Sequence, residues 1–302
     1  DRPFLGYGLE NFSIGFDRYY DPSVPYIDKN WGAWWDRAHN IIFQTASDAG
    51  VFAVIIYIAL FVALFWQMSR CAKSGEARQK ITTHAMQATL IGYFVANFFS
   101  FDSYSSYVLF FLIIAYTLHI NGFQTLQEQT AWRKQKPLLA FVLFCVLAVF
   151  LWQYNFVPLA TNEKINRAEA LSQQKKCSEA LGLMDKALQR RSFLDSYARM
   201  QYVQIIKICN EFYPENGIAY RQKGIELIKE AVKIQPKYTR YWMFLGEAST
   251  FLAKQEQDSE TKSSLLKEAE EYLNKALALA PKHQEIFVDL AKMEIVAQNF
   301  EK

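Results

Sequence analysis

The sequence lacks the patterns that mark several common classes of protein. Its 33 Lys and Arg nearly balance its 30 Asp and Glu, leaving a net charge of +3, so charge alone indicates no nucleic-acid partner. The four cysteines form no CxxC or Cys/His spacing, so we expect no zinc site and no other metal. No phosphate-binding loop or dinucleotide fingerprint is present, and we expect no cofactor.

A cleavable export signal is also missing. No basic segment with a following cleavage site stands at the start of the sequence, so we expect no removable signal peptide. We expect an internal fragment of a longer protein, because the sequence begins with Asp and ends in NFEK. The length suits about two domains. The composition changes near Tyr154, from aromatic and aliphatic residues to Lys, Glu, Gln, Ala and Leu.

Four apolar segments dominate the first half. Roughly 20 apolar residues cross a bilayer core, and central Leu, Ile, Phe and Val favour insertion. The second segment is interrupted by Gln87, Thr89 and Asn97, which indicates a polar face toward neighbouring helices. A soluble helical core would carry more charge. The sequence therefore predicts an all-α fold whose polytopic transmembrane bundle has spans near Val51–Met68, Ala85–Phe101, Tyr104–Ile120 and Leu138–Tyr154.

The charges of the short loops predict the orientation, because positive loops stay in the cytoplasm. The loops after the first span and before the fourth are basic, through Arg70, Lys73, Arg78 and Lys80, and through Arg133, Lys134 and Lys136. We therefore predict an extracytoplasmic loop with an interfacial helix at 1–50, four transmembrane helices at 51–157, and extracytoplasmic helical repeats at 158–302. The two polar-half cysteines, Cys177 and Cys209, could pair only outside the cytoplasm, and their redox state stays open.

Small and apolar residues recur in the second half. Three sets share one spacing: Ala180, Met184, Ala187 and Ser192; Gly224, Ile228, Ala231 and Pro236; Ala269, Leu273, Ala276 and Pro281. With Trp242, Leu245 and Gly246, they resemble the tetratricopeptide pattern. The sets begin 44 and 45 residues apart, more than that repeat's usual period, and the polar insertion KQEQDSETKSS predicts loops or longer helices. QNFEK predicts the start of another helix.

Two interpretations of these repeats stay open. Stacked repeats create a concave surface for a protein or glycan partner. The alternative is an array of helical hairpins that only packs against itself.

The loop before the first span carries the candidate chemistry. Asp36 predicts a helix N-cap, and the spacing of Ile41, Ile42, Thr45, Ala46 and Ala49 predicts an amphipathic interfacial helix that ends at Gly50.

Tryptophans beside a span are usually interface anchors, with sugar stacking as the other interpretation of Trp31, Trp34 and Trp35. Arg37 could meet lipid phosphate, and His39 could be one more polar interface residue. Of the other histidines, we place His84 and His119 at cytoplasmic helix ends and His283 in a loop.

The order PFLGYGLENF, RAHNIIFQTASDAG and an apolar span resembles the O-antigen ligase superfamily. That superfamily contains lipopolysaccharide O-antigen ligases, O-antigen polymerases and protein O-oligosaccharyltransferases, some with tetratricopeptide repeats. The resemblance covers about residues 1–120, with Asp48 where Glu is commoner and Ala53 where Gly is often seen. The matching residues are Gly6, Gly8, Phe12, Arg37, His39, Asn40 and Gly50.

The resemblance implies an inverting membrane glycosyltransferase that moves a glycan from polyprenyl pyrophosphate to an acceptor hydroxyl. It implies catalytic roles for His39 and Arg37, and substrate binding by Asn40. Trp35 is a further candidate for substrate binding, through sugar stacking. Asp102, in the turn between the second and third spans, is a candidate to orient His39 or the acceptor, and the alternative is an ordinary turn residue. A neutral imidazole can take a proton from a hydroxyl, and a guanidinium can bind pyrophosphate. Residues two apart on a helix face different ways, so Arg37 must lie at or before the first turn to meet the substrate that His39 meets. The sequence has no Asp-x-Asp pair, which fits a lipid-linked donor.

Two classes of function follow. One is the carboxy-terminal part of such a transferase in the bacterial inner membrane, with a glycan, lipid or protein acceptor and a protein partner for the repeats. Family members have more spans, so we do not expect this chain to be a complete enzyme. The other is a non-catalytic membrane anchor that displays helical repeats for envelope complex assembly. The sequence does not choose between ligase, polymerase and protein glycosyltransferase.

Overall fold

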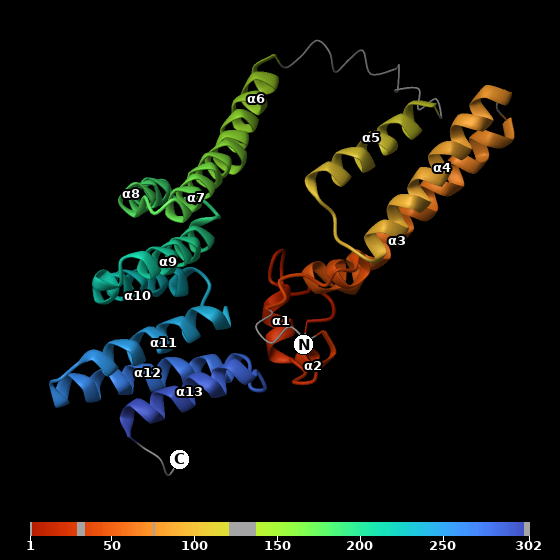
Figure 1. The fold of residues 1–302 in the computed structure, drawn as a ribbon. Helices are drawn as coiled ribbons and strands as arrows, with labels where there is room; N and C mark the ends of the chain where they lie inside the picture. The colour runs from red at the N-terminus through yellow and green to blue at the C-terminus, as the bar shows by residue number, and fades with distance from the viewer. Residues whose placement is uncertain (1, 29–33, 75, 121–136, 299–302) are drawn as a thin grey trace. The chain divides into compact units, whose positions relative to one another are not determined.

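The chain is all-helical in the computed structural model, which describes residues 2–28, 34–74, 76–120 and 137–298 (Figure 1). No strand occurs in these ranges, which confirms the predicted all-α class. The chain forms two compact units, Asp1–Phe16 with Trp31–Gln135, and Asp17–Asn30 with Lys136–Lys302. This division cuts across the predicted domains, since residues 17–30 and the fourth apolar segment join the repeats.

The first unit is built on three long helices, α3 (Ile41–Ser74), α4 (Ala77–Phe98) and α5 (Tyr104–Ile120). Aromatic rings form its core, because Phe110 stacks on both Tyr93 and Phe61, at centroid distances of 4.9 and 5.5 Å. The buried residues of α4 recur every three or four positions, which defines one packed face. They are Thr83, Met86, Leu90, Tyr93 and Asn97. Other faces of these helices expose large apolar side chains, such as Ile56 and Val62.

Two helices are long and apolar enough to cross a membrane: Ile41–Lys73 and Ala140–Gln173. The first contains the predicted span Val51–Met68, the second overlaps the predicted span Leu138–Tyr154, and the two suggest membrane association. The third segment, Ser105–His119, is apolar but shorter. The four-span count stays a prediction for the second and third segments.

In the second unit, α6 (Pro137–Leu151) continues through a π-helical turn, Trp152–Phe156, into α7. The two short helices of the amino-terminal segment are α1 (Phe12–Arg18) and α2 (Val24–Asp28). The helices of the polar half pack in the pairs α7 with α8, α9 with α10 and α11 with α12, and α13 packs on both members of the last pair. Their bounds are α7 Val157–Gln173, α8 Cys177–Leu188, α9 Asp195–Phe212, η3 Pro214–Asn216, α10 Gly217–Ile234, α11 Thr239–Gln255, α12 Ser259–Leu279 and α13 Gln284–Ala297.

The recurring small and apolar residues lie in the core of this unit. At the small positions, neighbouring helices pack closely: a Cβ on Gly246 would lie 2.5 Å from Cγ of Leu273, and one on Gly224 would lie 2.9 Å from Cζ of Phe244. The fully buried members of the three sets are Ala180, Met184, Ile228, Ala231, Ala269, Leu273 and Ala276. The spacing read from the sequence therefore identifies helix-packing positions.

The helix ends also follow the sequence pattern. The helix α10 ends at Ile234, ahead of Pro236, and α12 ends at Leu279, ahead of Pro281, because Pro cannot continue a helix. The polar insertion does produce a longer helix: α12 has 21 residues, and its N-cap Asp258 accepts a hydrogen bond from the Thr261 amide. Gln298, with φ of 60°, ends α13, and the rest of QNFEK lies outside the described residues.

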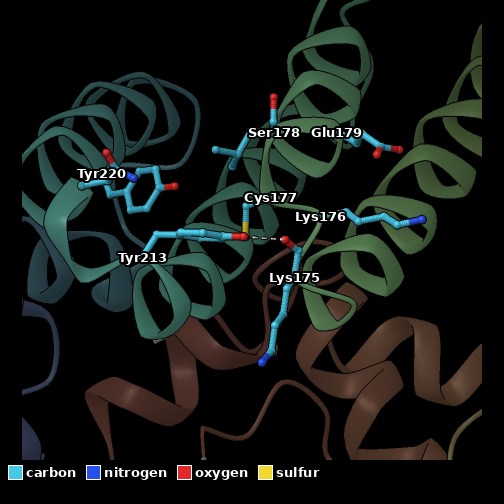
Figure 2. Close-up of a pocket in the computed structure, with 9 residues that line it drawn as sticks. Lys175, Lys176, Cys177, Ser178, Glu179, Tyr213 and Tyr220 are labelled. Carbon is cyan, nitrogen blue, oxygen red and sulfur yellow. Dashed lines mark hydrogen bonds between the residues drawn. The ribbon is translucent and has the colours of Figure 1, made fainter.

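A disulfide joins Cys177 at the start of α8 to Cys209 near the end of α9, so the pairing that the sequence left open is present. Cys71 and Cys145 are free. Beside the disulfide lies an open cavity of about 470 Å³, lined by Lys175, Lys176, Cys177, Ser178, Glu179, Leu181, Tyr213, Asn216 and Tyr220. The Tyr213 hydroxyl donates to the Lys175 carbonyl at 3.1 Å (Figure 2).

Candidate functional site

Three glycines, Gly6, Gly8 and Gly50, allow the backbone of the amino-terminal loop to pack directly against α3. The amide of Gly8 donates to the Asp48 carbonyl at 3.0 Å, and the amide of Val51 donates to the Pro3 carbonyl at 2.8 Å. Gly50 interrupts α3 with φ of 81° and ψ of −179°, a conformation that essentially only Gly adopts. A Cβ there would overlap the carbonyl of Phe4, and one on Gly6 would lie 2.5 Å from the Ser47 carbonyl. The predicted break at Gly50 is confirmed, and the Gly-x-Gly pattern has a packing reason.

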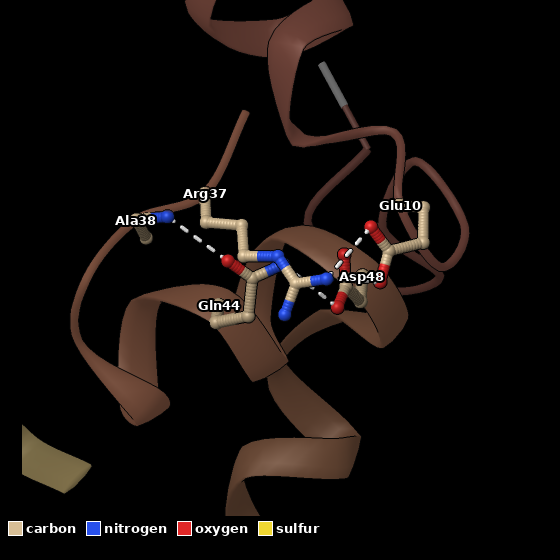
Figure 3. Close-up of polar contacts among 5 residues, drawn as sticks. All are labelled: Glu10, Arg37, Ala38, Gln44 and Asp48. Carbon is tan, nitrogen blue, oxygen red and sulfur yellow. Dashed lines mark hydrogen bonds and ion pairs between the residues drawn. The ribbon is translucent and has the colours of Figure 1, made fainter. Parts of the chain in front are cut away.

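This fastening holds Arg37 in a defined place. Its Nη2 donates to both carboxylate oxygens of Glu10, at 2.9 and 3.2 Å (Figure 3). The guanidinium lies over the ring of Phe101, 4.6 Å from its centroid, in a cation–π contact. Sequence reasoning missed Glu10. The available signal was its position inside the glycine motif GYGLENF, which the loop folds against α3.

A second set of contacts holds the backbone beside Arg37. The side chain of Gln44 accepts from the Ala38 amide at 2.9 Å and donates to the Asp48 carboxylate at 2.9 Å (Figure 3). The segment that carries Arg37 is therefore pinned to the first turns of α3.

His39 lies against the same aromatic ring as Arg37. Its imidazole meets Phe101 edge-on at 5.1 Å and Trp35 edge-on at 6.0 Å, and the residue is exposed. Its φ of 49° is left-handed, which is uncommon outside Gly and is a form of local strain. Both Arg37 and His39 precede α3, which begins at Ile41. Arg37 therefore lies before the first helical turn, as it must if Arg37 and His39 are to contact one substrate.

The predicted cap of this helix was wrong. Asp36 lies outside the helix, and Asn40 supplies the cap instead: its Oδ1 accepts from the amides of Ile42 and Phe43 at 2.9 and 3.1 Å. The Nδ2 of Asn40 donates to the Phe98 carbonyl at 2.8 Å. A cap needs a side-chain oxygen over the first free amides, and only Asn40 directly precedes them. Its amide positions the loop, and its substrate contact stays a prediction.

Asp102 belongs to a buried polar cluster rather than to the His39 contacts. It accepts from the Tyr93 hydroxyl at 2.6 Å, the Asn97 amide at 3.0 Å and the Ser106 hydroxyl at 2.9 Å. Buried carboxylates need several donors, so its turn joins α4 and α5 through these bonds. Of the three tryptophans, Trp34 and Trp35 are described, and Trp31 lies outside the described residues.

The second unit holds a contact that the sequence did not indicate. His283 lies in the connection between α12 and α13, as predicted, but it is buried at the N-cap of α13, and its ring stacks on Tyr20 at 4.4 Å. Gln284 Nε2 donates to the Pro22 carbonyl at 2.8 Å. Burial lowers the pKa of His283 to about 4. Burial raises the pKa of Asp17 to about 6, and this effect outweighs the opposing influence of Thr239 and Arg240.

The repeats also carry a charged cavity. It has a volume of about 430 Å³, and its lining comes from α10, α11, α12 and α13. Within it, Arg221 Nη1 lies 3.5 Å from Glu247, and Lys292 Nζ lies 2.9 Å from Asp289. Among the described residues, no group of three His, Cys, Asp or Glu side chains could hold a metal ion.

No model of a known protein family matches the chain, and no curated protein matches it. The assignment of a function therefore rests on the residues themselves. The strongest arrangement is the one around Phe101, where a cation, an imidazole and a carboxylate meet next to an apolar helix.

Proposed function

We propose that this chain is the carboxy-terminal part of an inverting membrane glycosyltransferase of the O-antigen ligase type. The observation that carries the proposal is that Arg37 and His39 contact one ring, Phe101, at 4.6 and 5.1 Å. Both lie just ahead of α3, which is long and apolar enough to cross a membrane. A lipid-linked donor would present its pyrophosphate at this depth, where the apolar helix meets water.

The residues suit a single displacement at the anomeric carbon. The oxygen of an acceptor hydroxyl forms the new bond to that carbon, and the bond from the carbon to the pyrophosphate oxygen breaks. His39 takes the hydroxyl proton, and Arg37 stabilises the negative charge that develops on the polyprenyl pyrophosphate leaving group. Attack from the side opposite the leaving group inverts the anomeric centre. Trp35 and Phe101 flank the imidazole and offer apolar surface for a sugar ring.

The proposal places α3, α4, α5 and α6 as four spans of a bacterial inner membrane bundle. The loop with His39 and the repeats then share the extracytoplasmic side, as the positive loops predict. The Cys177–Cys209 disulfide supports this orientation, because disulfides persist in oxidising compartments.

The second unit supports a recruiting role. Its helix pairs and its buried Ala and Gly positions suit a tetratricopeptide-like array, and its charged cavity could receive an acceptor or an assembly partner. A non-catalytic scaffold would use this unit equally well. It would have no use for Arg37 and a strained His39 at the base of α3, so the transferase is the better account.

Glycan transfer by the protein in membrane vesicles tests the proposal, with a polyprenyl-pyrophosphate glycan and acceptors from the host envelope. His39→Asn is the variant of choice, because Asn tolerates the left-handed backbone and lacks the imidazole. We expect transfer to fall by about 100-fold or more, with unchanged protein accumulation. His84→Asn, in α4, is the matched control and should keep full transfer. Full transfer by His39→Asn would refute the proposal.

A further inference from the structure

Glu10 holds Arg37 through a contact that leaves part of the guanidinium unused. Both Glu10 oxygens take their hydrogen bonds from one nitrogen, Nη2. The tightest guanidinium–anion pairs use two parallel bonds from two nitrogens. The Glu10 contact is therefore weaker than the one that a well-placed phosphate can make.

Glu10 is also easy to displace. Its side chain is 72% exposed, against 29% for Arg37, and ion pairs between exposed groups contribute little. Its φ of 60° is left-handed, which is costly for a residue with a side chain. Arg37 keeps its place without Glu10, because Phe101 supports the guanidinium and Gln44 pins the neighbouring backbone.

We propose that Glu10 is a specificity-determining residue that competes with anions for Arg37, so that a pyrophosphate displaces it and a phospholipid phosphodiester does not. This inference rests on the proposed function. An arginine at a membrane surface meets phospholipid headgroups, each with a single phosphate charge. A pyrophosphate carries more negative charge and more acceptor oxygens than a phosphodiester, so it binds the guanidinium more strongly. A built-in carboxylate thus excludes the weaker anion, which is specificity through competition.

The test measures donor KM and kcat for the protein in nanodiscs that contain either a neutral lipid without phosphate, such as a galactolipid, or phosphatidylglycerol. With neutral lipid, Glu10→Gln should lower the donor KM by about two- to fivefold, the range for an exposed ion pair, with kcat unchanged. With phosphatidylglycerol, Glu10→Gln should lose this gain, whereas the wild-type KM should change little. Glu10→Gly should behave in the same way, because the charge and not the backbone strain is the cause.

Glu163→Gln is the matched control. It removes another exposed carboxylate that is paired with an arginine, 3.4 Å from Arg167, and it should leave both constants unchanged. An unchanged donor KM in Glu10→Gln would overturn the inference. A fall in kcat of about 100-fold would also overturn it, since Glu10 would then act on the reacting atoms.

Arg37→Gln separates this inference from the proposed function. If Arg37→Gln weakens donor binding while Glu10→Gln does not strengthen it, only the role of Glu10 is wrong. If Arg37→Gln leaves donor binding intact, the proposed function fails with it.

Discussion

Tyr20 and His283, from opposite ends of the sequence, stack with their ring centroids 4.4 Å apart, and each is only 3% exposed. Residues 17–28 are therefore an integral part of the helical-repeat unit. They cover the amino-terminal ends of α11 and α13, where Asp17 meets Thr239 and Pro22 accepts from Gln284. Deleting this segment would expose buried surface of the repeats.

The buried Asp17 and His283 should give opposite pH dependences that nearly cancel. The pKa of Asp17 is raised from 3.8 to about 6, so as pH falls from 6 to 4 the folded state gains a proton first and becomes more stable. The pKa of His283 is lowered from 6.5 to about 4, so over the same range the unfolded state gains a proton first and folding is weakened. Each effect amounts to about 3 kcal/mol.

Single substitutions of Asp17 and His283 should reveal the two opposite pH dependences separately. As the pH falls from 6 to 4, the Asp17→Asn variant should become less stable, because only the effect of His283 remains. The His283→Phe variant should become more stable, because only the effect of Asp17 remains. The measurement is the melting temperature of the repeat unit in the detergent-solubilised protein at each pH. Parallel pH profiles for the two variants and the wild type would contradict the assigned burial.

Gly246 should be intolerant of any side chain. A Cβ there meets Cγ of Leu273 at 2.5 Å, whereas a Cβ on Gly182 has nothing within 4 Å. We expect Gly246→Ala to cost about 1 to 3 kcal/mol through overpacking, and Gly182→Ala in α8 to gain about 0.5 to 1 kcal/mol from helix propensity. Urea unfolding measures both. Equal effects of the two substitutions would rule out the close packing of α11 on α12.

Gly50→Ala should disrupt the fastening of the amino-terminal loop. Its φ of 81° and the nearby Phe4 carbonyl exclude a side chain, and the strain alone costs about 1 to 3 kcal/mol. We expect faster hydrogen exchange at the amides of Tyr7 and Gly8, and a loss of glycan transfer. Gly92→Ala, with nothing within 4 Å of its Cβ, is the control. Unchanged exchange in Gly50→Ala would show that the loop is held by other contacts.

The disulfide tests the side of the membrane on which the repeats lie. Cys177 and Cys209 are 32 residues apart, and closing such a loop stabilises a fold by about 3 to 4 kcal/mol. The protein is taken from cells, denatured and alkylated before any reduction. Only Cys71 and Cys145 should then be modified. Modification of all four cysteines before reduction would place the repeats in a reducing compartment.

Local patterns predicted much of this structure. The spacing of Ala, Gly and apolar residues indicated the packed faces of α8, α10 and α12, because that spacing repeats along one helix. The break at Gly50 was predictable because the helical spacing of apolar and small residues that begins at Ile41 ends at this glycine. Asp36 was a wrong choice of cap because Asp and Asn are equally good caps, and only the position of the first free amides decides between them.

The remaining features depend on distant contacts. Glu10 reaches Arg37 only after the glycine loop folds onto α3, and no local pattern encodes that approach. The burial of His283 depends on Tyr20, far away in the sequence. Whether Cys177 and Cys209 pair depends on the compartment as well as on geometry.

The most direct test of the account is the release of polyprenyl pyrophosphate from a labelled donor by the purified protein, with and without an acceptor. We expect release that requires the acceptor, matches glycan transfer one to one, and falls together with transfer in His39→Asn. Release at equal rates in wild type and His39→Asn, by protein that is folded in both cases, would contradict a catalytic site at the start of α3.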